Sequence, residues 1–147
     1  MVSQASPGVT ERLSAATTAG LRRLDEDRDL SRLLFRGLGS FPELLQRFGD
    51  GEINRFHRAA ADMLTELAGD RDGAVDWAAI AVVLQGATTQ YWLLTDLFGQ
   101  HPTGVDEDRF VRAVTTLTAA LIANSAGAQP DRDAVIAESP DTQVKET

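Results

Sequence analysis

The sequence predicts an all-α protein, a bundle of five or six helices, and three observations support this fold class. Apolar residues recur at helical spacing in several stretches of the 147-residue chain. No stretch shows the alternation of apolar and polar residues that marks a half-buried strand. The segment between Asp76 and Asp96 carries no charge, although charged residues make up 24% of the chain. We therefore expect one buried helix with the other helices arranged around it.

The first half of the chain predicts two helices separated by a turn. Residues 1–8 are small or polar and form a flexible lead-in, and a helix over 9–24 follows. The acidic run at 25–29 resembles a metal-ligand cluster, but its spacing fits no known metal-binding loop. We expect it to be a solvated turn that ends one helix and caps the next. The next helix covers 29–41, with Leu30, Leu33, Leu34, Leu38 and Phe41 on its apolar face and a break near its end.

The second half predicts three more helices and a tail. An amphipathic helix covers 52–67, and the glycine-flanked segment 69–73 ends it. That segment is a turn rather than a calcium loop, because its glycine falls too early and no bidentate glutamate follows. The central helix covers 77–98 and the last helix 108–122. The predicted organisation is a lead-in at 1–8, a helical domain at 9–126 and a disordered tail at 127–147.

The central helix is apolar on two opposite sides. Only Gln85, Thr89 and Asp96 occupy the narrow wedge between these sides, which we expect to face water. One side can pack on the core of its own chain, and the other then needs a second layer, most economically a second subunit. The first side consists of Trp77, Ile80, Ala81, Leu84, Ala87, Thr88, Tyr91, Leu94 and Phe98. The second consists of Ala79, Val82, Val83, Gly86, Gln90, Leu93 and Leu97.

A membrane span is the alternative interpretation of this segment. Its length is close to the roughly 20 apolar residues that a bilayer requires. However, Gln85, Thr88, Thr89, Gln90 and Thr95 interrupt it, and no Lys/Arg cluster flanks either end. We therefore expect a helix buried in protein and no membrane partner.

Charge and cysteine content exclude several classes of partner and chemistry. The net charge is −8, and residues 73–147 hold 10 acidic against 4 basic residues. Such a balance repels phosphate backbones and anionic lipids. The absence of cysteine excludes disulfides and thiolate metal sites. No secretory signal opens the chain, so the cytoplasm is the expected location.

The sequence offers few candidates for catalysis. His57 and His101 are the only histidines, and neither belongs to a metal-binding spacing. No nucleophile elbow and no glycine-rich phosphate loop occurs. We therefore expect no catalytic residues, no metal, no cofactor and no enzymatic activity.

A small-molecule pocket is a second expectation. Polar and aromatic side chains interrupt the inner side of the central helix, and aromatic residues of the preceding helices point to the same interior. A mostly apolar lining with a few polar anchors is typical of ligand pockets, but the same residues also suit a filled core, and the sequence leaves both open. The candidate ligand-binding residues are Phe35, Phe41, Phe56, His57, Met63, Trp77, Leu84, Thr88, Tyr91 and Trp92.

Three segments resemble the C-terminal regulatory domain of TetR-family transcriptional repressors: LAGDRDG (67–73), VLQGATTQYWLL (83–94) and DEDRFVRAVTTLTAALI (106–122). The resemblance spans roughly residues 9–125 and consists of loose patterns. It implies a homodimer whose last two helices form a four-helix bundle with those of the partner, and a pocket for a hydrophobic effector. The candidate dimer-interface residues are Val82, Val83, Gly86, Gln90, Leu93, Leu97, Thr116, Ala119 and Ala123.

The family's helix-turn-helix has no counterpart in this sequence, so operator binding does not carry over, and we expect no nucleic-acid binding by this chain alone. The first functional hypothesis is a dimeric regulatory domain that binds a largely apolar small molecule. The second is a structural dimerisation module without a ligand, which could titrate a full-length relative. An enzyme with a helical cavity is a distant third.

Overall fold

The computed structural model describes residues 7–37, 40–69 and 75–127, and the regular structure in these ranges is entirely helical. The predicted all-α fold is therefore confirmed. Residues 1–6 of the expected lead-in and 128–147 of the expected tail lie outside the described residues. The elements are α1 (Pro7–Glu26), α2 (Arg28–Gly37), α3 (Pro42–Phe48), a π-helical turn (Gly49–Ile53), α4 (Asn54–Ala68), α5 (Trp77–Phe98) and α6 (Glu107–Gly127).

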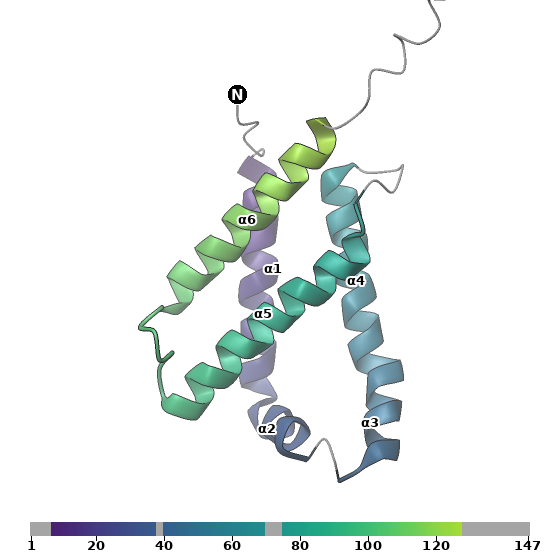
Figure 1. Ribbon diagram of the computed structural model, residues 1–147, viewed down its shortest axis with the longest axis vertical. Coiled ribbons are helices and arrows are strands. Elements are labelled where there is room, and N and C mark those ends of the chain that lie inside the picture. The colour runs from purple at the N-terminus through teal and green to yellow at the C-terminus, as the bar shows by residue number, and fades with distance from the viewer. Residues whose placement is uncertain (1–6, 38–39, 70–74, 128–147) are drawn as a thin grey trace, which may run out of the picture.

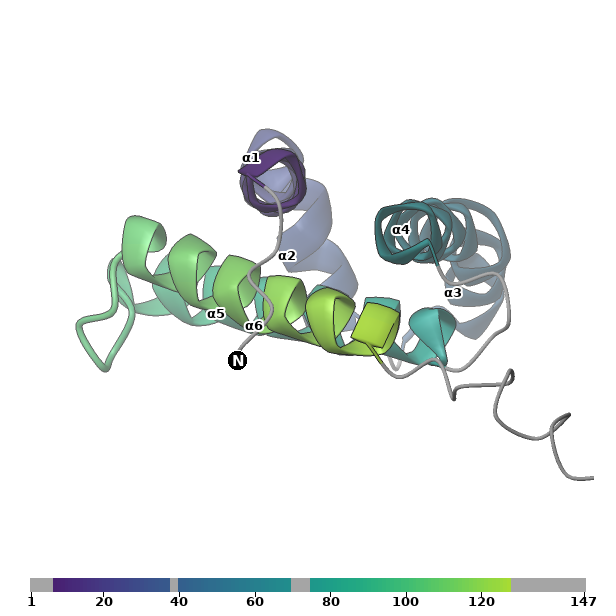
Figure 2. The same cartoon turned by 90° about the horizontal axis from the view of Figure 1, so that it is seen from above.

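The helices form two layers. Seen from above, α1 to α4 lie on one side of a layer made by α5 and α6 (Figure 2). Figure 1 shows α5 running obliquely in front of α1 and α4, with α6 returning in the same layer. No described element covers the other side of the α5–α6 layer. Within the described ranges, no helix is long and apolar enough to cross a membrane.

Two clusters of buried side chains hold the layers together. The first joins α1, α4, α5 and α6 and centres on Leu64 and Ala81, which are almost fully buried. The second joins α1, α5 and α6 through Leu21, Tyr91, Trp92 and Val111. Burying one large apolar side chain stabilises a fold by about 1.5–3 kcal/mol. Since α5 contributes to both clusters, it is the central element of the described fold.

The ends of α5 are set by local signals. The Asp76 carboxylate accepts a hydrogen bond from the backbone N–H of Ala79 at 2.9 Å, which satisfies a donor of the first turn. At the other end, Gly99 adopts a left-handed conformation with φ of 76°, which residues with a side chain rarely adopt. These two caps produce the predicted span of 77–98.

The orientation of α2 differs from the prediction. The apolar side of this helix was expected to face the core, but Leu33 is 58% exposed and Leu30 is also exposed. Among the α2 side chains that the structure describes, Ser31 is the buried one, and its hydroxyl lies 3.5 Å from the carbonyl oxygen of Leu24. Arg28 and Arg32, on the same helix as Ser31, contact Asp96 of α5, as described below.

The orientation of α6 is also rotated from the expected one. Leu117 shares one face of the helical pattern with Phe110, Val114 and Leu121, but it is 72% exposed. The buried side of α6 instead includes Val111, Val114, Thr115, Thr118 and Ile122. Ala119 and Ala123, predicted at the dimer interface, are buried, and Ala119 belongs to the first core cluster. These two small residues on α6 serve close packing within the chain.

One buried hydroxyl has no partner in the described part of the structure. Thr115 is 4% exposed, and its Oγ1 makes no hydrogen bond. By contrast, the buried hydroxyls of Thr88 and Thr118 donate to carbonyls one turn earlier, at 2.9 and 2.8 Å. An unsatisfied buried polar group destabilises the folded state by about 1–3 kcal/mol.

We expect Thr115→Val to raise the free energy of unfolding by about 1 kcal/mol, because it keeps the side-chain shape and removes the unsatisfied hydroxyl. Urea denaturation measures the change. Thr118→Val is the matched control, because it removes a hydroxyl that makes a hydrogen bond. Its free energy of unfolding should therefore rise less than that of Thr115→Val. A lower stability for Thr115→Val than for the control would contradict the assignment.

Candidate functional site

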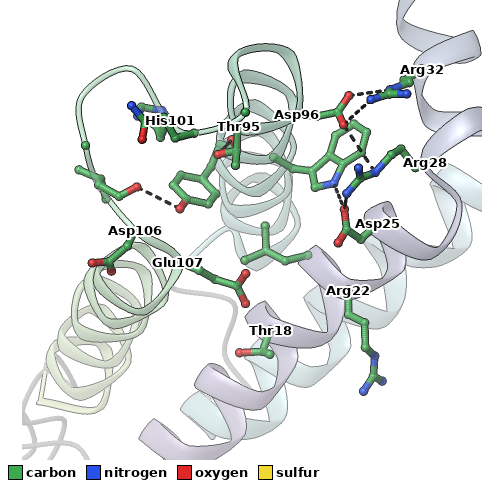
Figure 3. Close-up of a pocket in the computed structure, with 17 residues that line it drawn as sticks. Thr18, Arg22, Asp25, Arg28, Arg32, Thr95, Asp96, His101, Asp106 and Glu107 are labelled. Carbon is green, nitrogen blue, oxygen red and sulfur yellow. Dashed lines mark hydrogen bonds and ion pairs between the residues drawn. The ribbon is translucent and has the colours of Figure 1, made fainter.

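A hollow of about 690 Å³ opens where α1, α2, the end of α5 and the turn into α6 meet (Figure 3). Its apolar wall comes from Leu21 and the two aromatic residues Tyr91 and Trp92. Its rim carries both arginines and carboxylates. The lining is completed by Thr18, Arg22, Asp25, Arg28, Arg32, Thr95, Asp96, Gly99, Gln100, His101, Gly104, Val105, Asp106 and Glu107.

One carboxylate attaches α2 to α5. Arg32 donates two hydrogen bonds to Asp96, from Nε to Oδ2 at 2.8 Å and from Nη2 to Oδ1 at 2.9 Å. The Asp96 side chain is 8% exposed, and Nε of Arg28 lies 3.5 Å from its Oδ1. The hydrogen bonds from Arg32 are the main reason why the pKa of Asp96 lies below its ordinary value. The expectation that Asp96 faces water is therefore wrong.

A second carboxylate attaches the end of α1 to α5. Asp25 Oδ1 accepts a hydrogen bond from Nη2 of Arg28 and another, at 3.2 Å, from the indole Nε1 of Trp92. Hydrogen bonding to Arg28, and then to Trp92, lowers the pKa of Asp25. The acidic run 25–29 forms the turn between α1 and α2 and its side chains are largely exposed, as expected, while Asp25 also makes this contact with α5.

Aromatic stacking fixes the turn between α5 and α6. The ring of Tyr91 stacks with those of Phe110 and His101, at centroid distances of 4.2 and 5.2 Å. Its hydroxyl donates to the carbonyl oxygen of Val105 at 3.0 Å, and burial raises its pKa. His101 is half-buried as part of this stack.

The beginning of α6 supplies two further carboxylates. Asp106 Oδ1 accepts a hydrogen bond from the backbone N–H of Arg109 at 2.9 Å and so caps the helix. Glu107 makes no hydrogen bond or ion pair with any other described residue. No group of three His, Asp or Glu side chains in the described ranges could hold a metal ion.

The structure brings together only two of the ten predicted ligand-binding residues at this hollow, Tyr91 and Trp92. Trp77 and Thr88 are buried elsewhere along α5, and Met63 and Leu84 pack against the first core cluster. His57 is half-buried, and its Nδ1 donates to the carbonyl oxygen of Ile53 at 2.8 Å. Phe41 and Phe56 are exposed, and the side chain of Phe35 lies outside those that the structure describes.

The residues of the hollow that sequence reasoning missed include the charged ones. Asp25 and Trp92 are 67 positions apart, and Arg32 and Asp96 are 64 apart. No local pattern marks such pairs. The mixture of both charges in the Asp25–Asp29 region was the only hint, and it equally suits a solvated turn.

A surface on the α5–α6 layer is apolar and exposed. Among the predicted interface residues, Val83 is 64% exposed, and Val82, Gly86, Gln90, Leu97 and Thr116 are exposed as well. Leu93 is half-buried, and Ala119 and Ala123 lie in the core of the chain. Leu117 and Phe98, which were not predicted at the interface, are exposed. We call Val82, Val83, Gly86, Leu97 and Leu117 the outer face.

We expect Asp96→Asn to lower the free energy of unfolding by about 1–2 kcal/mol at neutral pH, since it weakens charged hydrogen bonds whose arginine donors are half exposed. Because the folded-state pKa of Asp96 is lowered, its contribution is present above its ordinary value of 3.8 and is lost as the pH falls through the lower folded value.

Thermal or urea denaturation of both proteins from neutral pH to below 3.8 measures this effect. The difference between wild type and Asp96→Asn should shrink as the pH falls. Asp62→Asn on the exposed side of α4 is the control with the same change of charge. A stability difference between wild type and Asp96→Asn that stays constant over the whole pH range would show that the ionised Asp96 carboxylate does not stabilise the fold.

Comparison with known proteins identifies no family for the chain. No protein-family model, no curated protein and no solved structure matches it. The resemblance to TetR-family regulatory domains thus stays a hypothesis.

Proposed function

We propose that the protein is a homodimeric, effector-binding regulatory domain of the TetR type. Two copies pair through α5 and α6 as a four-helix bundle, and a small molecule occupies the hollow. The single observation that supports this proposal best is the two-sided character of α5. One side is buried in both core clusters, while Val82, Val83 and Leu97 on the other side are exposed. A helix that is apolar all round is normally covered all round.

The outer face has the properties of a self-complementary interface. It carries no charge, because α5 lacks charged residues from Trp77 to Thr95 and α6 lacks them from Ala113 to Gly127. Two copies can therefore meet about a two-fold axis without placing like charges opposite each other. Exposed small residues, Gly86 on α5 and Ala113 and Ala120 on α6, allow the helices to approach closely.

The hollow supports the effector part of the proposal. Its size falls within the range of about 300–1,000 Å³ that is usual for small-molecule sites. It combines an apolar wall at Leu21 and Trp92 with polar groups at the rim. The end of α5 and the beginning of α6 form one of its sides, and both helices carry the outer face. An effector that binds one arrangement of these helices better would shift the equilibrium between pairing geometries.

A dimerisation module without a ligand is the second candidate. The observation that favours it is the filled first core cluster, in which α4 packs on α5 through Leu64 and Ala81. In this version the protein pairs with a full-length relative and titrates it. Both candidates act in the cytoplasm without contacting nucleic acid through this chain, whose net charge of −8 opposes it.

We expect Gly86→Phe to weaken the dimer by about 1–3 kcal/mol per site, because the added ring overpacks the contact between subunits. A Cβ atom at Gly86 meets nothing within 4 Å in the single chain, so the substitution leaves the fold of each copy intact. Sedimentation equilibrium measures the dissociation constant, and circular dichroism checks the helix content.

Gly8→Phe is the matched control, since a Cβ atom at Gly8 also meets nothing within 4 Å but lies at the start of α1. It should leave the dissociation constant unchanged. A monomeric wild-type protein at micromolar concentration, or equal effects of the two substitutions, would refute pairing through α5 and α6.

A further inference from the structure

The arginines around the hollow are already paired. Arg32 and Arg28 donate to Asp96 and Asp25, two carboxylates of the same lining. Arg22 forms an ion pair with a glutamate one turn along α1, at 3.5 Å. Each guanidinium group of the lining therefore has a carboxylate partner, which leaves little positive charge to attract an anion.

The carboxylates of the lining are not all paired in the same way. Asp25 and Asp96 bind arginines, and Asp106 caps α6. Glu107 is the one lining carboxylate for which the described structure contains no hydrogen bond or ion pair. Figure 3 shows its carboxylate extending from the start of α6 toward α1. The lining holds four carboxylates against three arginines, so its net charge is negative.

The hollow also has an apolar wall, and the protein as a whole is negatively charged. Leu21 and Trp92 are both buried in the second core cluster and both line the hollow. The indole N–H of Trp92 is taken up by Asp25, so the wall offers the apolar part of the ring. The protein carries a net charge of −8, which raises the local concentration of cations.

We infer that the hollow binds an organic ammonium ion with a compact apolar body, whose nitrogen pairs with the Glu107 carboxylate while its apolar part lies against Leu21 and Trp92. This inference rests on the proposed effector role of the hollow and names the chemical class of the effector. A neutral molecule of the same shape gains the apolar contact but leaves Glu107 unpaired. An anion of the same shape meets Asp106 and Glu107 with like charge.

Three probes of similar shape test the charge preference on the full chain: naphthylmethylammonium, neutral naphthylmethanol and the anion naphthoate. Isothermal titration calorimetry should give a dissociation constant below about 1 mM for the ammonium probe and values about fivefold or more higher for the other two. In NMR spectra, the indole N–H resonance of Trp92 should shift on binding. That of Trp77, in the first core cluster, should not.

Two substitutions test whether Glu107 causes the preference for the ammonium probe. Glu107→Gln should remove the advantage of the ammonium probe over the neutral one, and Glu107→Lys should make naphthoate the preferred probe. Asp108→Asn is the matched control, because Asp108 lies in the same first turn of α6 but does not line the hollow. It should leave the order of the three affinities unchanged.

The outcomes separate this inference from the proposed function. Equal affinities for the three probes, or an unchanged preference in both Glu107 variants, would overturn the ammonium class and leave the hollow as an effector site of another kind. No binding by any probe, with the wild-type protein still a dimer in sedimentation, would overturn the ammonium site but not the pairing through α5 and α6.

Discussion

The apolar surface of α5 on two opposite sides is the constraint on which the rest of the structure depends. One side brings α1, α4 and α6 together, because Trp77, Ala81, Tyr91 and Trp92 each enter one of the two core clusters. These four side chains therefore decide which helices pack on this side of α5. The other side has no described helix on it (Figure 2), and its valines and Leu97 contact water in the single chain. A second copy covers such a surface without any new structural element.

At the C-terminal end of α5, contacts of charged and aromatic side chains, rather than apolar packing alone, hold the neighbouring elements. Asp96 holds α2 by two hydrogen bonds from Arg32, and Tyr91 holds the turn into α6 by stacking and by its hydroxyl. These contacts fix three elements around one hollow but do not fill it. The hollow thus lies where α2 meets α5 and the beginning of α6. The outer face belongs to α5 and α6, and the exposed Leu33 belongs to α2. A bound molecule would contact all of these elements, which is the arrangement that regulation requires.

The helices were predictable from the sequence, and part of their packing was not. The bounds of α5 follow from Asp76 and Gly99, whose cap preferences are local. The orientations of α2 and α6 depend on contacts with partners distant in the sequence. Arg32 meets a carboxylate 64 positions away, a contact that the amphipathic pattern of α2 does not predict. The same applies to the hollow, whose lining comes from four separate segments, so only Tyr91 and Trp92 were anticipated there.

The central claim is that α5 and α6 pair with a second copy, and a distance across the two-fold axis tests it most directly. The chain lacks cysteine, so Leu117→Cys provides a single attachment point for a spin label. Pulsed electron paramagnetic resonance should then show an intermolecular distance shorter than the roughly 30 Å length of α6, because packed helices lie about 8–10 Å apart. A label at Leu33→Cys should give a longer distance. The absence of a dipolar signal at position 117, or a shorter distance at position 33, would contradict the account.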